Sequence, residues 1–184
     1  GGTMNNRVTY ALYQHFQYRG FAVMRFNFRG VGRSQGVYDN GEGELSDAAT
    51  AMDWLQSQNP ASNQCWIAGF SFGSWIGMQL MLRRPELRGF ISVTPPASTR
   101  DFSFLAPCPA SGLIIHGEED AAVPPETVHK LVERLSIQKG VEIEVDIVPG
   151  ANHFFTDHLD PMIARVSDYL DGALKTEPEA APLF

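Results

Sequence analysis

The stretch Cys65-Trp66-Ile67-Ala68-Gly69-Phe70-Ser71-Phe72-Gly73 decides the fold of this chain, because it joins two structural patterns across one serine. Its first residues form a short apolar run that predicts a buried strand over 64–68. The following residues predict a helix over 72–84, which stops at Pro85. A Gly-x-Ser-x-Gly match alone is weak, but a strand, a sharp turn and a helix are the context that an exposed nucleophilic serine requires. Ser71 is therefore a candidate nucleophile, and the alternative is a glycine-rich connection with an incidental serine.

Strand and helix patterns alternate along the chain. Besides 64–68, short apolar runs predict strands over 21–28, 88–94, 113–116 and 141–148. Helical periodicity predicts a first helix that Thr3 caps and Gly20 ends, a second that ends before Pro60, and others over 72–84, 126–137 and 161–174. This alternation is typical of a mostly parallel sheet covered on both faces, a three-layer α/β/α sandwich. We expect a single domain over 1–174 and a frayed tail over 175–184, which has no periodicity.

Length and composition indicate an ordinary globular domain. The 184 residues suffice for one hydrophobic core, and 43% hydrophobic with 19% charged residues is usual for soluble proteins. The net charge of −7 argues against nucleic acid or an anionic membrane as the main partner. No apolar run approaches the roughly 20 residues that span a bilayer, so we expect no membrane insertion. Two lone cysteines, Cys65 and Cys108, indicate reduced thiols and a cytoplasmic protein.

Three polar residues follow predicted strands in the order serine, aspartate, histidine. Ser71 follows the strand at 64–68, Asp120 follows the strand at 113–116, and His153 follows the last strand. Parallel strands bring such loops to one edge of the sheet, where open α/β folds bind ligands. A serine hydroxyl needs a base to take its proton, and the base needs a carboxylate to fix its tautomer. The sequence therefore predicts Ser71 as nucleophile, His153 as base and Asp120 as acid.

Other carboxylates and imidazoles compete for two of these roles. Glu118 and Glu119 adjoin Asp120 and offer the same chemistry, and Asp101 is a more distant candidate. His158 is the rival base. The remaining histidines have other expected places: His116 packs near the site, while His15 and His129 lie on the helix surfaces.

The chain lacks the spacing of common metal and nucleotide sites. No His-x-x-x-His or paired cysteine spacing occurs on one predicted element, so we expect no metal. The glycines within 29–36 lack both the Lys-Ser/Thr ending of a phosphate loop and the dinucleotide fingerprint. We therefore expect no cofactor.

At this point the chain resembles the α/β-hydrolase superfamily, and within it the small, lid-poor bacterial hydrolases of dienelactone-hydrolase-like appearance. The matching segments are Gly-Gly-Thr-Met-Asn-Asn at 1–6, Phe-Asn-Phe-Arg-Gly-Val-Gly-Arg-Ser-Gln-Gly at 26–36, Gly-Phe-Ser-Phe-Gly at 69–73 and Gly-Ala-Asn-His-Phe-Phe at 150–155. The resemblance implies the Ser71, Asp120 and His153 roles given above and makes the backbone N–H of Phe72 an oxyanion donor. Dienelactone hydrolases use a cysteine nucleophile, so Ser71 points to ester or thioester hydrolysis instead.

The front of the chain departs from the family pattern. Similar proteins have a His-Pro-His-Pro-like loop and at least one more strand before Gly-Gly-Thr-Met. The residues Gly-Gly-Thr before Met4 are therefore better interpreted as the start of a protein fragment than as a cloning scar. The superfamily's strand order places a further strand between 21–28 and 64–68. Its loss opens a gap within the sheet and removes the loop that supplies the second oxyanion donor. The resemblance therefore implies a fold of poor stability and weak activity for this chain alone.

The expected function is a serine hydrolase that cleaves a carboxylic ester or thioester through an acyl-enzyme on Ser71. The connection over 95–109 is too short for a large cap domain, which favours an open pocket for a small-molecule acyl substrate. The candidate lining residues are aromatic, and some of them are expected in the core instead: Phe70, Phe72, Phe102, Phe104, Phe154 and Phe155. A peptidase for short peptides and a non-catalytic hydrolase-like binding protein are the alternatives.

Overall fold

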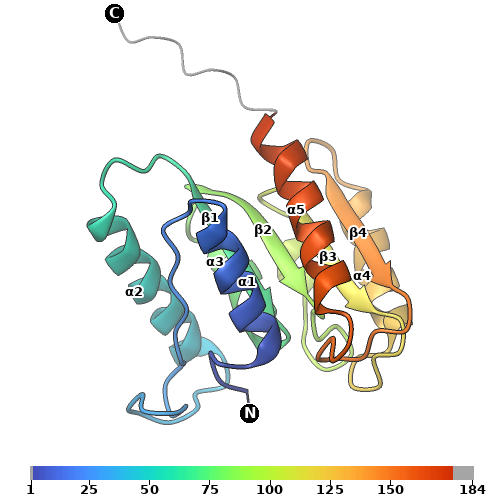
Figure 1. Ribbon diagram of the computed structural model, residues 1–184, viewed down its shortest axis with the longest axis horizontal. Coiled ribbons are helices and arrows are strands. Elements are labelled where there is room, and N and C mark those ends of the chain that lie inside the picture. Colours follow the sequence, from blue (N-terminus) through green and yellow to red (C-terminus); the bar gives the residue numbers. More distant parts are fainter. Residues whose placement is uncertain (1, 176–184) are drawn as a thin grey trace, which may run out of the picture.

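Four parallel strands form the sheet, in the order β1-β2-β3-β4 (Figure 1). The structure, a computed structural model, describes residues 2–175, so the tail predicted to fray lies outside the described residues except for Lys175, which ends a helix. The strands are β1 (Cys65–Phe70), β2 (Leu87–Val93), β3 (Gly112–Gly117) and β4 (Ile143–Val148). Helix α3 (Phe72–Met81) connects β1 to β2, the short 3-10 helix η1 (Ser103–Leu105) lies between β2 and β3, and α4 (Pro125–Ser136) connects β3 to β4. The predicted parallel sheet is confirmed.

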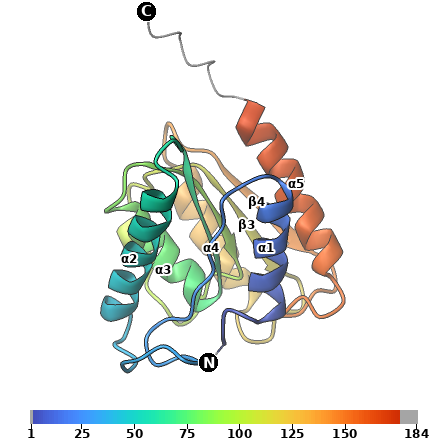
Figure 2. The same cartoon turned by 60° about the vertical axis from the view of Figure 1, so that its left-hand side comes forward.

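Helices cover both faces of this sheet. On one face α1 (Arg7–Tyr18) and α5 (Leu159–Lys175) lie side by side, as Figures 1 and 2 show. On the other face lie α2 (Glu42–Gln58), α3 and α4. Each face has its own hydrophobic core, with Phe90 and Ile114 of the sheet on the α3 side and Ile91 and Leu113 on the α1 side. The alternation of side chains along parallel strands thus produces the predicted α/β/α sandwich.

The first helix starts later than its apolar stripe predicts. Asn6 is the N-cap, because its Oδ1 accepts a hydrogen bond from the Thr9 backbone N–H at 2.9 Å. Thr3 lies outside the helix, so the predicted Thr3 cap is wrong; asparagine caps helices at least as well as threonine does. The helix after Ser71 is also shorter than predicted and ends at Met81. None of the described helices is both long and apolar enough to cross a membrane.

Residues 21–28 do not form the predicted strand. They carry no regular secondary structure, although the pattern of their apolar residues is that of a strand. Asn27 Oδ1 accepts a hydrogen bond from Met4 N at 2.8 Å, and Arg25 Nη1 donates to Met4 O at 2.9 Å. The segment is therefore tied to the N-terminal side of α1, and a strand requires a neighbouring strand for its backbone hydrogen bonds.

A large cavity separates this segment from the sheet. Its volume is about 1090 Å³, and its lining includes residues 19–31 on one side and 62–73, with the whole of β1, on the other. Among residues 2–175 no strand pairs with the outer edge of β1, and Ala68 in the middle of that strand is exposed. Because no described strand lies beside this edge of β1, residues 21–28 have no partner for their backbone hydrogen bonds, which explains why they are not a strand.

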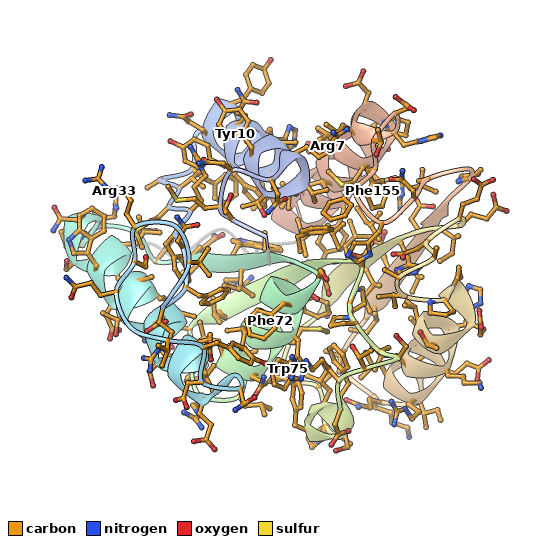
Figure 3. All side chains as sticks on the ribbon, turned by 90° about the horizontal axis from the view of Figure 1, so that it is seen from below. Arg7, Tyr10, Arg33, Phe72, Trp75 and Phe155 are labelled. Carbon is orange, nitrogen blue, oxygen red and sulfur yellow. The ribbon has the colours of Figure 1, made fainter. Side chains whose placement is uncertain are left out.

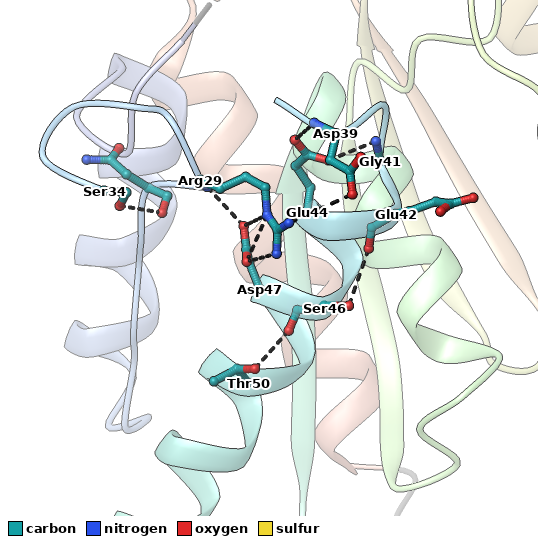
Figure 4. A network of polar contacts seen from close by, with 10 residues as sticks. Arg29, Ser34, Asp39, Gly41, Glu42, Glu44, Ser46, Asp47 and Thr50 are labelled. Carbon is teal, nitrogen blue, oxygen red and sulfur yellow. Dashed lines mark hydrogen bonds and ion pairs between the residues drawn. The ribbon is translucent and has the colours of Figure 1, made fainter. Parts of the chain in front are cut away.

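A polar network anchors the loop after residue 28 beside the sheet (Figure 4). The buried Glu44 accepts hydrogen bonds from the backbone N–H groups of Asp39 and Gly41, each at 2.8 Å. Asp47 Oδ1 accepts from Arg29 Nη2 at 2.8 Å, while its Oδ2 accepts from the Arg29 backbone. Both carboxylates lie on α2, so this helix holds the loop in place through charge-assisted hydrogen bonds.

Candidate active site

Ser71 lies at the apex of a sharp turn between β1 and α3. Its φ of 52° and ψ of −118° are strained for a residue with a side chain. Its backbone N–H donates to Val93 O at 2.9 Å, which ties the turn to the neighbouring strand β2. Its carbonyl accepts from Ser74 Oγ at 2.7 Å. The strand, turn and helix predicted from the sequence are therefore present, and the strain lies at the candidate nucleophile.

The two glycines that flank Ser71 have different roles. A Cβ on Gly69 would lie 2.5 Å from both Gly73 O and Ser74 Cα, so only glycine fits where β1 meets α3. A Cβ on Gly73 would meet nothing within 4 Å. The close packing of α3 against β1 therefore requires a glycine at 69 but not at 73.

This difference predicts opposite outcomes for two similar substitutions. Gly69→Ala should lower the free energy of unfolding by about 1–3 kcal/mol, because the backbone of α3 must move away from the new methyl group. Gly73→Ala should change stability by no more than about 1 kcal/mol, because alanine is a good helix residue and its methyl group has space. Urea unfolding of both variants measures the effect, and equal stability of the two would contradict this account of the turn.

The acid loop, residues 118–124 between β3 and α4, encloses a buried carboxylate. Asp120 is 3% exposed, and its Oδ1 accepts hydrogen bonds from Ala122 N at 2.9 Å and Val123 N at 2.8 Å. Glu118 and Glu119, its sequence neighbours, are exposed. Asp101 is also exposed and bonds to Ser103. Of the four carboxylates that compete for this role, only Asp120 is buried against its own loop.

The acid loop lies directly against the loop that carries His153. The Glu118 N–H donates to Val148 O at 3.0 Å and the Glu119 N–H to Ala151 O at 2.9 Å, which extends the pairing of β3 with β4. Gly117 permits this contact, because a Cβ there would lie 2.3 Å from Ala151 O. The glycine that ends β3 thus brings the two loops into register.

His153 and Asp120 form a direct hydrogen bond. His153 Nδ1 lies 2.8 Å from Asp120 Oδ2, and a carboxylate only accepts, so Nδ1 carries the proton. In the neutral imidazole, Nε2 is then unprotonated and able to accept a proton. Burial by itself would raise the pKa of Asp120, but hydrogen bonds from His153 and the Val123 backbone outweigh it, and the pKa lies below its ordinary value. Asp120 is therefore ionised at neutral pH and aligned with the imidazole.

Ser71 and His153 line the same cavity, the one that borders β1. The Phe70 ring packs 5.3 Å from the His153 ring, and Phe154, which is 48% exposed, lies 5.6 Å from Phe70. Phe70, Phe72 and Phe154 all belong to the lining. The wall beside Ser71 and His153 is thus aromatic on both sides.

Three of the predicted lining residues lie elsewhere. Phe102 is 3% exposed and belongs to the core on the α3 side, and Phe104 packs against the same core with its ring 5.8 Å from that of Phe102. Phe155 is fully buried in the core on the α1 side. Figure 3, which views the molecule from below, shows Phe155 and Phe72 on opposite sides of the sheet. Phe102 and Phe104 are therefore corrected from pocket to core residues, because η1 folds back onto α3.

Sequence patterns gave no sign of the groups that surround the Phe72 ring. The rings of Phe28 and Tyr38 lie 5.5 and 6.0 Å from it. The Arg100 guanidinium stacks 4.7 Å from the Trp75 ring and 5.5 Å from the Phe72 ring, and it donates to the Tyr38 hydroxyl at 2.9 Å. These contacts join two connecting segments, 19–41 and 94–102, to α3 around the residue after Ser71, and no local periodicity connects such distant residues.

The other histidines lie apart from the Asp120–His153 pair, with one exception. His158 lies beside Gly150, and His129 is exposed on α4 as predicted. His15 is half-buried rather than on the surface, and burial lowers its pKa. His116 is fully buried near Asp120. Within residues 2–175 no three His, Cys, Asp or Glu side chains are grouped so that they could hold a metal ion.

Two family models match this chain. The model described as X-Pro dipeptidyl-peptidase (S15 family) matches residues 2–106, and that of the prolyl oligopeptidase family matches residues 92–177. The first match contains Ser71, and the second contains Asp120 and His153.

Known proteins show the same fold. ATU1826 from Agrobacterium tumefaciens, a protein of unknown function, is 56% identical with a TM-score of 0.93, over 98% of this chain and 84% of that chain. XC6422 from Xanthomonas campestris, an α/β serine hydrolase without a lid, is 32% identical with a TM-score of 0.86, over 97% of this chain and 78% of that chain. A carboxymethylenebutenolidase homologue from Xenopus tropicalis is 27% identical over 60% of this chain and 51% of its own length. With the parallel sheet and the two family matches, these likenesses show that the chain belongs to the α/β-hydrolase superfamily of serine hydrolases.

Proposed function

We propose that this protein hydrolyses carboxylic esters or thioesters through an acyl-enzyme on Ser71. The observation that carries the proposal is the hydrogen bond of 2.8 Å between His153 Nδ1 and the buried Asp120 carboxylate, in a cavity that Ser71 also lines. The strained turn at Ser71 supports it, since strain of this kind concentrates at functional sites.

In the first half of the reaction, Ser71 Oγ attacks the carbonyl carbon while its proton passes to His153 Nε2. The Asp120 carboxylate stabilises the imidazolium that forms. Phe72 is the first residue of α3, so its N–H lacks an intrahelical partner and is free to donate to the developing oxyanion. His153 then gives the proton to the leaving oxygen or sulfur, which departs as an alcohol or a thiol.

In the second half, water replaces the alcohol or thiol. His153 takes a proton from the water, whose oxygen attacks the acyl carbon, and then returns that proton to Ser71 Oγ. The products are the free carboxylic acid and the regenerated serine.

A peptidase is the second candidate, because both matching family models describe peptidases. A dipeptidyl-peptidase must bind the free α-amino group of its substrate, for which a carboxylate is the natural partner. Two carboxylates line the cavity. Glu44 already accepts two backbone N–H groups and Glu86 Oε1 pairs with Arg84 Nε at 2.8 Å, so both carboxylates already have hydrogen-bond partners. The aromatic lining and the butenolidase homologue, named for a cyclic ester, favour the ester.

Matched substrates distinguish the two activities. The panel consists of p-nitrophenyl acetate, butyrate and octanoate, the corresponding thioesters, and Gly-Pro-p-nitroanilide with a free or an acetylated amino group. We expect turnover of the short esters and thioesters that requires Ser71, and no turnover of either anilide. Hydrolysis of Gly-Pro-p-nitroanilide that acetylation abolishes would assign the chain as a dipeptidyl-peptidase instead.

A further inference from the structure

A second histidine lies beneath the Asp120–His153 pair, and the proposed reaction does not use it. His116, near the end of β3, is completely buried. Its Nε2 lies 2.8 Å from Val123 O and 3.7 Å from Asp120 Oδ2. Burying an imidazole beside a buried carboxylate lowers stability unless the ring is hydrogen-bonded, so the hydrogen bonds of His116 indicate what this residue does.

The contact with Val123 fixes the tautomer of His116. A carbonyl only accepts, so Nε2 carries the proton and donates it to Val123 O. Nδ1 is then an acceptor, and it has no partner among the described residues. Burial lowers the pKa of His116, against opposing contributions from Val123 and Asp120, and the nearby His153 and His129 lower it further. His116 is therefore neutral at neutral pH.

The Val123 backbone is consequently held on both sides of its Cα. Its N–H donates to Asp120 Oδ1 at 2.8 Å, while its carbonyl accepts from His116. Asp120 Oδ1 is occupied by the loop backbone, which leaves Oδ2 for His153. A neutral His116 supplies this restraint without adding a second positive charge beside Asp120.

We infer that His116 is a positioning residue, which ties the Val123 carbonyl so that the acid loop presents Asp120 Oδ2 to His153. This inference rests on the proposed function for its effect on catalysis, but the geometry of the pair can be measured without any substrate.

Three variants separate positioning from packing. His116→Phe keeps a buried ring without the donor, and His116→Gln keeps a donor at nearly the place of Nε2. His116→Asn keeps a polar amide that is too short to reach Val123 and replaces the phenylalanine variant if that one does not fold. In ¹⁵N-histidine-labelled protein, the low-field proton signal of His153 Nδ1–H reports its hydrogen bond to Asp120.

We expect the low-field signal in the wild type and in His116→Gln, and its loss or upfield shift in His116→Phe. With short esters, kcat/KM of His116→Phe should fall by about 10- to 100-fold through kcat, because small misplacements of catalytic groups have effects of this size. A residue that only packs would change the melting temperature and leave the signal in place. A folded His116→Phe protein with an unchanged signal and unchanged kcat would overturn the inference. If the wild type hydrolyses no ester, the proposed function fails, and the NMR signal still decides the role of His116.

Discussion

Ser71→Ala should reduce the kcat of ester hydrolysis by about 10⁶-fold, because nothing else in a serine hydrolase replaces the attacking oxygen. The fold should survive the change. Ser71 holds its turn with backbone groups, through its N–H to Val93 and its carbonyl to Ser74, and alanine retains both. Alanine tolerates the φ of 52° about as well as serine does. Steady-state kinetics with p-nitrophenyl butyrate measures the loss.

Ser57→Ala is the matched control for this variant. Ser57 is exposed on α2, where its hydroxyl donates to the Trp54 carbonyl and accepts from Gln58 Nε2, so its loss should leave kcat unchanged. Circular dichroism and the melting temperature must agree among the three proteins. A folded Ser71→Ala protein that keeps a tenth of the wild-type rate would assign the nucleophile to another residue.

Asp120→Asn should lower kcat by about 10⁴-fold with little change in KM, although the substitution is almost isosteric. The carboxylate accepts the Nδ1 proton of His153 across 2.8 Å and thereby leaves Nε2 unprotonated. An amide NH₂ in its place would donate to Nδ1, and Nε2 would then carry the proton and be unable to take one from Ser71. Glu118→Gln and Glu119→Gln are the controls, since both side chains are exposed. Loss of activity in either control, with Asp120→Asn fully active, would move the acid role to that residue.

The same carboxylate makes stability depend on pH in a defined direction. The pKa of Asp120 is lower in the folded protein than its ordinary value of about 3.9. Its stabilising contribution is therefore complete above that ordinary value and is lost as the pH falls through the lower folded value. In urea unfolding between neutral and acidic pH, the wild type should lose more stability than Asp120→Asn, whose side chain does not titrate.

Local patterns were sufficient for most elements of this fold. The apolar run before Ser71 and the helix after it depend on neighbours in the sequence, and the structure has β1 and α3 in these places. The segment 21–28 has the same kind of pattern but is not a strand, because a strand also depends on a partner that no local pattern reveals. The position of a helix cap is also difficult to predict from local sequence. Asn6 is the cap instead of Thr3, because the backbone enters α1 three residues later than predicted.

In the candidate site, too, some features could be predicted from the sequence and others depend on the folded structure. Chain order alone indicated Ser71, Asp120 and His153, and the structure brings the last two into contact and all three to one edge of the sheet. Sequence favoured Asp120 over Glu118 and Glu119 but could not exclude the two glutamates, because that choice depends on burial, and only Asp120 of the three is buried. Nor could it separate the cavity residue Phe70 from the core residue Phe102, since both are aromatic residues in loops or strand ends.

Labelling with a fluorophosphonate, read by intact mass, examines the activated serine without assuming any substrate. The 184-residue chain is treated beside Ser71→Ala and Asp120→Asn. We predict one adduct on the wild type, none on Ser71→Ala and slow labelling of Asp120→Asn. No adduct on the folded wild type, or an adduct that persists in Ser71→Ala, would contradict the assignment of Ser71 as the nucleophile.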